Sequence, residues 1–344
     1  MKHLCIVNPK AGRVTGYVNN IVDEIKDFFA RNPRMDHTIH VTRWKRDASG
    51  YTMRFVNNAS EMVRVYAFGG SGTLFEVING VLGLPNVQVA YFPMGTDDDL
   101  LNIFGENARY EFTSMRNLSL SPVITIDTIM AGNHYVLTHV LIGLETISYQ
   151  LGLELSERFG LPLKISYFLA GIYYTVINSQ IRHYNIELEG VELEGNYTGI
   201  FIANASGNGL GTLAPDAVIN DGLMDLYTMK PVPKNRIIKI ITDYQKGQYT
   251  KWPEYITHYR CKKLRITSSV DMAITLDGEF FYDTELNLEV HPASLDFVCP
   301  TNVSAPVLIQ PPEEDLSKKK VSISNLNQTK EVSIADLLEG GDFL

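Results

Sequence analysis

The first third of the chain alternates between two patterns of hydrophobic and polar positions. Short apolar runs predict four β-strands, at residues 4–7, 37–42, 63–68 and 87–92. The segments between them carry apolar residues at helical spacing and predict helices, at residues 18–29, 51–59 and 74–82. Because strands and helices alternate with short connections, we expect a doubly wound α/β domain with a parallel sheet. Ligands of such sheets bind at the carboxyl ends of the strands.

From about residue 123 the pattern changes to strands separated by turn signals. These strands are predicted at residues 123–130, 135–142, 186–193, 197–204, 223–229, 263–268, 272–276 and 285–291. An apolar, aromatic-rich segment at 147–180 predicts a helical insertion. We therefore expect two domains, at 1–122 and 123–300, the second mostly antiparallel β. The tail 301–344 predicts a linker and a short helix at 332–338, or a partly disordered segment.

Composition narrows the class of protein. With 344 residues and 45% apolar residues the chain can bury a sizeable core. Its net charge of −9 argues against nucleic-acid binding, which depends on clustered Lys and Arg. Three cysteines lie far apart, so neither a disulfide framework nor a structural zinc site is expected. The longest apolar stretch is too short for a transmembrane segment. We expect a cytoplasmic protein, at most peripheral to the inner face of the membrane.

A glycine-rich turn joins the third predicted strand to the following helix. Gly69, Gly70, Gly72 and Thr73 stand between the apolar run and the first helical positions. Such a turn presents several backbone N–H groups and the positive end of a helix dipole to one point in space. That arrangement suits a phosphate.

Two further loops are predicted at the same edge of the sheet. Residues 8–13 follow the first strand, where Pro9 stiffens the turn and Ala11 and Gly12 let backbone approach a ligand. Residues 93–99 end in three consecutive aspartates, which are typical of a solvated helix N-terminus. They are also suited to holding Mg2+ beside a triphosphate. Together, the three loops indicate a nucleotide site.

Two acidic turns lie in the predicted β domain. Residues 212–225 are either a hairpin connection or a loop in which Asp216 or Asp221, with carbonyls, binds a hard cation. Asp277 and Glu279 flank a glycine at a strand end, which is typical of a hairpin turn. Beside a γ-phosphate, such a carboxylate could instead accept the proton of an attacking hydroxyl.

In this order the motifs resemble the diacylglycerol kinase catalytic family of bacterial lipid kinases, to which sphingosine and ceramide kinases are related. The resemblance covers the chain to about residue 300. Its motifs are Asn8-Pro9-x-Ala11-Gly12, Thr42 with Asp47-Ala48, Gly69-Gly70-x-Gly72-Thr73 with Glu76 and Asn79-Gly80, Pro93-x-Gly95-Thr96-x-x-Asp99, Leu213-Ala214-Pro215-Asp216-Ala217, Asp221-Gly222-Leu223 and Asp277-Gly278-Glu279.

The resemblance implies an N-terminal nucleotide domain, similar to NAD kinase and diacylglycerol kinase, and a C-terminal β-sandwich. The active site would lie in the cleft between them, and the tail would return to the first domain. Glu279 or Asp277 would be the general base. Mg2+ would be bound by Val218, Leu223 and Asp221, with Asp99 as a further metal ligand. The ATP-binding residues would be Asn8, Pro9, Lys10, Ala11, Gly12, Thr42, Gly69, Gly70, Ser71, Gly72, Thr73, Glu76, Gly95 and Thr96.

The implied activity is ATP-dependent phosphorylation of a hydroxyl of diacylglycerol or a related lipid presented at a membrane surface. The sequence leaves the oligomeric state open, with a homodimer among the expectations. Ser71 stands where the family carries an aspartate, and Asp97-Asp98 replaces a Gly-Asn pair. These departures favour a second hypothesis, a non-catalytic nucleotide- or lipid-binding member of the same fold. A third hypothesis is a NAD kinase-like enzyme, because that family shares the glycine turn.

Overall fold

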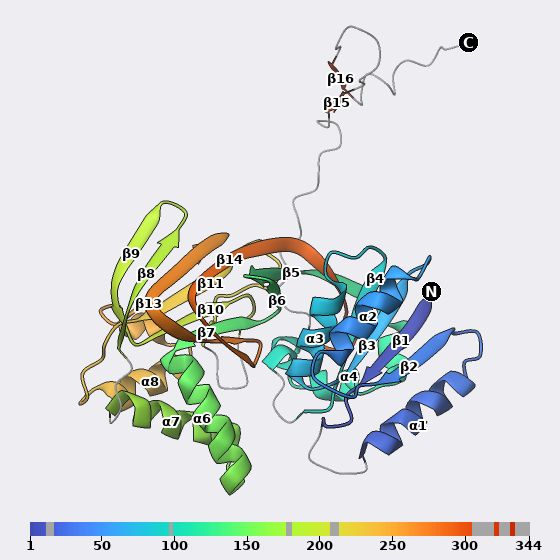
Figure 1. The fold of residues 1–344 in the computed structure, drawn as a ribbon, viewed down its shortest axis with the longest axis horizontal. Coiled ribbons are helices and arrows are strands. Elements are labelled where there is room, and N and C mark those ends of the chain that lie inside the picture. The colour runs from blue at the N-terminus through green and yellow to red at the C-terminus, as the bar shows by residue number, and fades with distance from the viewer. Residues whose placement is uncertain are drawn as a thin grey trace. The chain divides into compact units, whose positions relative to one another are not determined.

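Four parallel strands form the N-terminal part of the fold in the computed structural model (Figure 1). They are β1 (Lys2–Val7), β2 (His37–Val41), β3 (Val63–Gly69) and β4 (Val87–Pro93). β1 lies between β2 and β3, and β3 pairs with β4. Every residue of β3 is buried, as expected for a parallel strand that is covered on both faces. The predicted α/β class of this part is confirmed.

Helices pack against this sheet and close its core. They are α1 (Tyr17–Ala30), α2 (Asp47–Asn57), α3 (Ser71–Val81), the 3-10 helix η1 (Asp99–Phe104), α4 (Ala108–Phe112) and α5 (Met115–Leu120). One hydrophobic cluster joins Phe29 of α1, Val77 of α3 and Phe104 of η1 to the central strands. Phe104 also stacks on Phe297, so the last long strand of the fold contributes to this first core.

The rest of the fold is a β-sandwich-like arrangement built mostly from antiparallel pairs. Its strands are β5 (Val123–Ala131), β6 (His134–Val136), β7 (His139–Gly143), β8 (Arg182–Leu188), β9 (Val191–Tyr197), β10 (Gly199–Ala203), β11 (Met224–Met229), β12 (Ile256–Cys261), β13 (Lys263–Leu276) and β14 (Glu279–Val298). β14 arcs from the sandwich to the first sheet, where Phe297 pairs with Val89 of β4 (Figure 1). The two parts therefore share one hydrogen-bonded sheet path.

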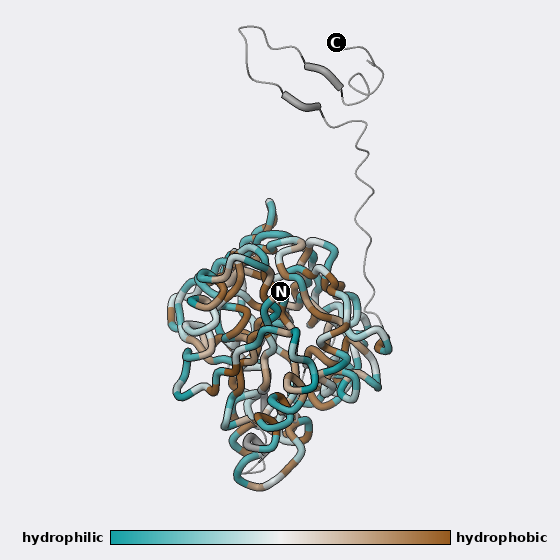
Figure 2. Tube along the Cα trace, turned by 90° about the vertical axis from the view of Figure 1, so that its right-hand side faces the viewer, coloured by the Kyte–Doolittle hydropathy of each residue, from teal (hydrophilic) through white to brown (hydrophobic). Residues whose placement is uncertain are grey.

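Helices α6 (Leu144–Phe159), α7 (Leu163–Val176) and α8 (Ile237–Gln245) and the 3-10 helix η2 (Tyr249–Lys251) accompany the sandwich. α6 ends at Gly160, whose left-handed φ of 68° is the usual way to stop a helix. A second hydrophobic cluster fills the sandwich, and a third lies between its strands and α8. Figure 2 shows the resulting concentration of apolar segments in the interior.

Several element boundaries differ from the sequence-based expectation. The strand predicted at 186–193 is a hairpin, because Glu189 and Gly190 both adopt positive φ and turn the chain. The strand predicted at 135–142 is divided between β6 and β7, and the one at 197–204 lies mostly in β10. The strands predicted at 263–268 and 272–276 are one strand with an irregularity in register. α8 and β12 were not predicted.

The structure describes residues 1–11, 17–95, 99–176, 181–206, 213–304, 320–322 and 331–333. Residues 1–308 form one unit and residues 309–344 a second. In the second, β15 (Lys320–Ser322) pairs with β16 (Glu331–Ser333), so the helix predicted from 332 does not begin there. The return of the tail to the first domain and the domain boundary at 122 stay predictions. None of the helices in these ranges has both the length and the apolar character needed to cross a membrane.

Candidate functional site

The carboxyl ends of the four parallel strands lie at one edge, because their registers align. Val7 pairs with Val41 on one side and Phe68 on the other, and Gly69 pairs with Pro93. The loops that follow these strands, with the first residue of β14, enclose a cavity of about 420 Å³. It is lined by Asn8, Pro9, Lys10, Ala11, Thr42, Arg43, Trp44, Lys45, Ala48, Gly70, Ser71, Gly72, Thr73, Glu76, Gly95 and Glu279.

The first loop and the glycine turn are tied together by hydrogen bonds. Asn8 Nδ2 donates to Thr73 Oγ1 over 2.9 Å, and the Lys10 backbone N–H donates back to Asn8 Oδ1 over 3.0 Å. A β carbon at position 69 would lie 2.2 Å from Thr73 Oγ1, so a glycine is needed for this approach. The two loops therefore form one preorganised wall of the cavity.

The glycine turn leads directly into a helix N-terminus. α3 begins at Ser71 with Gly70 as its N-cap, and no side chain caps it. The free N–H groups of a first helical turn and the helix dipole favour an anion. A β carbon at position 72 would lie 3.0 Å from Glu279 Oε1, so the Glu279 carboxylate reaches this same turn.

Glu76 shapes the cavity by holding the loop between β2 and α2. Its two carboxylate oxygens accept hydrogen bonds from the backbone N–H groups of Arg46, over 2.8 Å, and Ala48, over 3.2 Å. Arg46 has a left-handed φ of 70°, and its contact with Glu76 stabilises that turn. Glu76 lines the cavity, and both of its carboxylate oxygens hold the backbone of this loop. Its predicted role in binding ATP stays a prediction.

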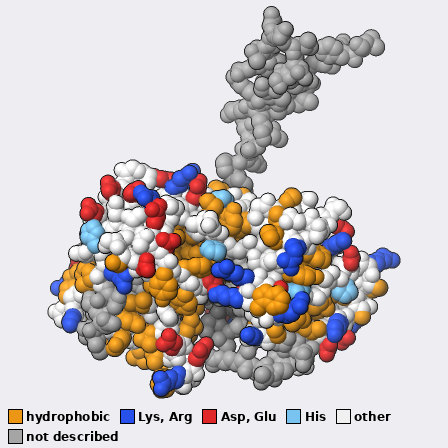
Figure 3. Space-filling model, viewed as in Figure 1, with side chains coloured by type: hydrophobic (Ala, Val, Ile, Leu, Met, Phe, Trp, Pro, Cys, Tyr) orange, Lys and Arg blue, Asp and Glu red, His pale blue; other side chains and the backbone are white. Residues whose placement is uncertain are grey.

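Sequence reasoning missed the basic side chains of this loop. Arg43 and Lys45 line the cavity with Lys10, and the Arg43 guanidinium lies over the Trp44 ring at 5.1 Å. Figure 3 shows Lys and Arg side chains gathered where the two parts of the fold meet. The available signal was the run Arg43-Trp44-Lys45-Arg46 directly after a predicted strand. These cations make the cavity suitable for a polyanionic ligand.

The buried Asp47 anchors this loop from behind. Its carboxylate accepts hydrogen bonds from the Arg43 backbone N–H over 2.9 Å and from His40 over 3.1 Å. Burial acts to raise the pKa of Asp47, but the hydrogen bonds from Arg43 and His40 outweigh it and lower that pKa. Asp47 is therefore charged at neutral pH and fixes the start of α2.

The two predicted candidates for a general base occupy different environments. Asp277 is 7% exposed, and its carboxylate accepts hydrogen bonds from the backbone N–H groups of Leu137, Thr138 and His139 and from the Thr138 hydroxyl. Glu279 has a side chain that is 25% exposed, lines the cavity and forms an ion pair with Lys45 over 2.5 Å. Of the two, Glu279 has the carboxylate that a ligand in the cavity could reach.

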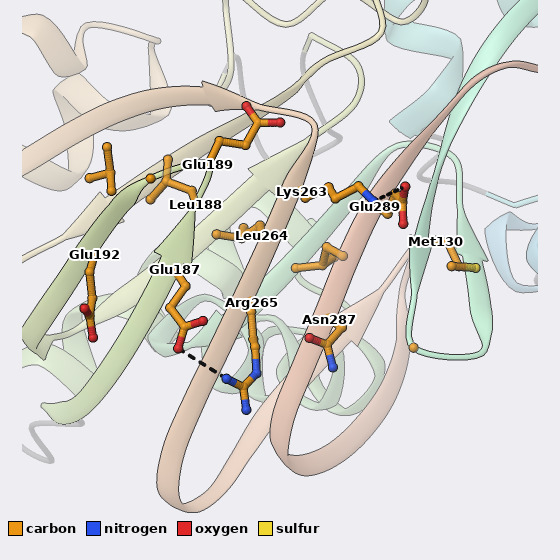
Figure 4. A pocket seen from close by; sticks show the side chains of 14 residues that line it. Met130, Glu187, Leu188, Glu189, Glu192, Lys263, Leu264, Arg265, Asn287 and Glu289 are labelled. Atoms are coloured by element: carbon orange, nitrogen blue, oxygen red, sulfur yellow. Dashed lines mark hydrogen bonds and ion pairs between the residues drawn. The ribbon is translucent and has the colours of Figure 1, made fainter.

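A larger groove, of about 730 Å³, lies elsewhere on the sandwich, near the β8–β9 turn (Figure 4). Two of its cations already have partners. Lys263 pairs with Glu289 over 2.8 Å and Arg265 with Glu187 over 3.2 Å. The groove contains none of the predicted site residues and no ends of the parallel strands, so volume alone does not make it the better candidate.

Comparison with known proteins identifies the two parts of the fold. Residues 2–131 match the diacylglycerol kinase catalytic domain, and residues 153–299 match the YegS C-terminal NAD kinase beta sandwich-like domain. The chain belongs to the diacylglycerol kinase catalytic domain family. The match to both parts confirms the predicted family and the α/β plus β-sandwich fold.

Individual relatives of this diacylglycerol kinase family chain are distant but cover most of it. It is 26% identical over 288 residues to the "Probable lipid kinase YegS-like" of Shewanella frigidimarina, which covers 80% of this chain and 88% of that protein. It is 27% identical over 246 residues to the diacylglycerol kinase of Staphylococcus aureus (strain JH9), covering 69% and 74% respectively. A solved diacylglycerol kinase structure from Bacillus anthracis shares the fold with a TM-score of 0.65 at 21% identity, covering 88% of this chain and 98% of the other.

Several predicted site residues of this family member fall outside the described parts of the structure. Gly12, Thr96 and Asp97-Asp98 are among them, and for Asp99 the backbone alone is described, at the start of η1. Gly69 is not among the lining residues but contacts Thr73, which is, and the other predicted ATP-binding residues in the described ranges line the cavity. Their role in binding ATP stays a prediction.

The predicted Mg2+ site of this family member has an arrangement that does not fit a metal ion. The Asp221 carboxylate, 3% exposed, forms an ion pair with Arg260 and accepts a hydrogen bond from the Leu223 backbone N–H over 3.0 Å. Arg260 also contacts the buried Asp225 over 3.4 Å. The Arg260 guanidinium thus balances these carboxylates at the place where Mg2+ was predicted. Within the described residues there is no group of three His, Cys, Asp or Glu side chains placed to hold a metal.

A buried carboxyl group lies beneath the helical insertion. Glu145, at the start of α6, accepts a hydrogen bond from the Tyr167 hydroxyl of α7. Burial raises the pKa of Glu145 to about 7, although the hydrogen bond from Tyr167 acts in the opposite direction. This pair links the two helices of the insertion and makes their packing sensitive to pH near neutrality.

Proposed function

We propose that this chain transfers the terminal phosphoryl group of ATP to a hydroxyl of diacylglycerol or a related lipid, with Glu279 as general base. One observation carries the proposal: the Glu279 carboxylate lies against Gly72, at the uncapped N-terminus of α3, inside the cavity at the strand ends. A helix N-terminus that can hold phosphate and a carboxylate within reach of it are what phosphoryl transfer to an alcohol requires.

The nucleotide is proposed to bind with its phosphates along the glycine turn. The N–H groups of α3 would bind phosphate oxygens, and Lys10 and Arg43 would balance their charge. The wall formed by Asn8 and Thr73 would hold the turn in place without rearrangement. Because this chemistry depends mainly on positioning and electrostatics, a preorganised wall is the contribution that the protein has to make.

In the reaction the acceptor hydroxyl oxygen forms a bond to the terminal phosphorus. The bond from that phosphorus to the bridging oxygen breaks, and its electron pair leaves with ADP. Glu279 receives the hydroxyl proton. Asp277 is proposed to act indirectly, by fixing the turn that carries Glu279 through its hydrogen bonds to residues 137–139. We also propose that ATP is used with Mg2+, but no step is assigned to the metal.

The acceptor is proposed to arrive from the side of the helical insertion. Tyr149 of α6 has its ring 6.0 Å from that of Phe280, the residue after Glu279. On α7, Ile165, Leu169 and Tyr173 are exposed apolar side chains at four-residue spacing, so they share one helix face. Figure 3 shows an apolar patch in this region of the surface. Such a face supports work at a bilayer surface, where a lipid acceptor resides.

The test is transfer of radiolabelled phosphate from ATP to diacylglycerol, ceramide, sphingosine and NAD, with and without Mg2+. We expect a labelled lipid. Labelled NAD would instead support a NAD kinase-like enzyme. Absence of transfer, together with ATP binding in a calorimeter, would support a non-catalytic member, which the serine at position 71 favours. In that case Ser71→Asp is expected to restore turnover.

A further inference from the structure

An ion pair spans the mouth of the candidate cavity. Lys45 belongs to the loop between β2 and α2, whereas Glu279 begins β14, 234 positions later in the chain. The Lys45 ammonium lies 2.5 Å from Glu279 Oε2. The Lys45 side chain is 71% exposed, so this ammonium is free to reorient at little cost in packing.

The charges in the cavity make Glu279 the natural partner of Lys45 in the absence of a ligand. Three cations line the cavity, those of Lys10, Arg43 and Lys45, against the carboxylates of Glu76 and Glu279. Both oxygens of Glu76 already accept backbone hydrogen bonds. Glu279 is therefore the carboxylate that remains to balance the loop.

A bound triphosphate would change this balance. Its terminal phosphate at the α3 N-terminus would lie close to Glu279, because Glu279 Oε1 contacts the same turn at Gly72. A phosphate carries more charge and more acceptor oxygens than a carboxylate, so it competes well for an ammonium. While Glu279 stays paired with Lys45, the ammonium occupies one of its two carboxylate oxygens, which leaves fewer lone pairs to accept a hydrogen bond from a substrate hydroxyl.

We propose that Lys45 is a positioning residue that pairs with Glu279 in the empty cavity and moves to the terminal phosphate when nucleotide binds. The nucleotide thereby releases the Glu279 carboxylate to face the acceptor hydroxyl. This inference rests on the proposed function, since it requires a nucleotide in the cavity. It adds a residue that neither the motifs nor the predicted site contained.

The experiment is a double-mutant cycle on ATP affinity, measured by titration calorimetry at fixed ionic strength and without lipid. Glu279→Gln frees Lys45, so we expect ATP to bind about five-fold tighter, the order of one exposed ion pair. Lys45→Met is expected to weaken binding about five-fold or more. In the Lys45→Met background, Glu279→Gln should then change the affinity by less than about two-fold.

A matched control separates this exchange from simple repulsion between Glu279 and the nucleotide. Lys10→Met removes another positive charge from the same cavity, and in that background Glu279→Gln should still tighten binding about five-fold. If Glu279→Gln tightens binding equally in the Lys45→Met background, Glu279 acts directly and the inference is wrong. If wild type does not bind ATP at all, the proposed function fails, and this inference fails with it.

A kinetic readout checks that Lys45 acts in the nucleotide complex during phosphoryl transfer as well as on ATP binding. At saturating ATP, Lys45→Arg keeps a cation that can exchange partners and is expected to retain most of the wild-type kcat. Lys45→Met is expected to lower kcat, because the cation that moves to the terminal phosphate is then missing when charge develops there during transfer. Lys10→Met should act mainly on KM for ATP. Equal kcat for Lys45→Met and wild type would overturn the positioning role.

Discussion

Replacing Asp277 with asparagine tests whether its carboxylate stabilises the fold or takes part in phosphoryl transfer. The Asp277 carboxylate accepts four hydrogen bonds, from the N–H groups of Leu137 at 2.6 Å, Thr138 at 2.9 Å and His139 at 3.1 Å, and from the Thr138 hydroxyl at 2.5 Å. Its left-handed φ of 46° is one that asparagine also tolerates. The substitution therefore alters the hydrogen bonds and leaves the backbone preference intact.

The size of the effect follows from the number of donors left without an acceptor. Asparagine offers one carbonyl oxygen, and its NH2 group faces donors where a carboxylate oxygen was. One or two buried donors then lose their partner, each costing about 1–3 kcal/mol. Because Asp277 is only 7% exposed, water cannot replace the lost acceptor. We expect Asp277→Asn to lower the free energy of unfolding by about 3 kcal/mol.

The assay is equilibrium unfolding in urea, followed by circular dichroism, together with phosphoryl transfer by the folded variant. Asp271→Asn is the matched control, since Asp271 is exposed on β13, the strand that ends just before Asp277, and should change stability by less than about 0.5 kcal/mol. If Asp277→Asn unfolds at the wild-type urea concentration yet loses transfer as fully as Glu279→Gln, Asp277 takes part in the chemistry. That result would contradict the structural role assigned to Asp277.

Other predictions concern pH, a glycine and a guanidinium. Burial raises the pKa of Glu145 from 4.5 to about 7, so the folded state holds the proton more tightly than the unfolded state and the free energy of unfolding falls as pH rises through 7. Between pH 5.5 and 8.5 the free energy of unfolding of wild type in urea should fall by about 2 kcal/mol. The Glu145→Gln variant should not show this loss. Gly69→Ala places a methyl against Thr73 and should weaken ATP binding at least about ten-fold in calorimetry. Gly195→Ala, on β9 and away from the cavity, meets only an ordinary contact with Tyr197 at 3.8 Å and should bind ATP normally. Arg260→Met removes the guanidinium partner of Asp221 and one of two basic partners of Asp225, whose other partner is His258, and should lower the melting temperature. Mg2+ and EDTA should leave the melting temperature of wild type unchanged.

The alternation of apolar runs and helical segments was enough to predict the first sheet. β1, β3 and β4 are largely buried apolar runs with turn-forming residues at their ends, such as Asn8 after β1 and Gly70 after β3, whereas β2 is mostly exposed or half-buried. The sandwich was harder to predict, because a short turn can lie inside what reads as one strand. The chain turns at Glu189 and Gly190, where the apolar alternation shifts by one residue, and the single strand predicted at 186–193 overlooked that shift and the glycine.

Some residues of the candidate site could be predicted from the sequence, and others could not. The glycine turn and the first loop were found because parallel strands carry their carboxyl ends to one edge, so neighbours in space follow from strand order. Asp277 and Glu279 could not be assigned different roles from the sequence. Their roles depend on which backbone N–H groups surround each carboxylate, and those neighbours are known only from the fold. Lys45 was missed because the sequence does not show that the fold brings Glu279 beside it, and a lysine in a loop is otherwise typical of an exposed surface.

As the proposed general base, Glu279 accepts the proton of a lipid hydroxyl while ATP occupies the cavity. Phosphoryl transfer at saturating ATP and lipid, compared between wild type and Glu279→Gln, tests this role. We predict a phosphorylated lipid from wild type, and a kcat lower by about 10²–10⁴ for the variant at unchanged stability. A Glu279→Gln enzyme that transfers phosphate to lipid at the wild-type rate would contradict the account.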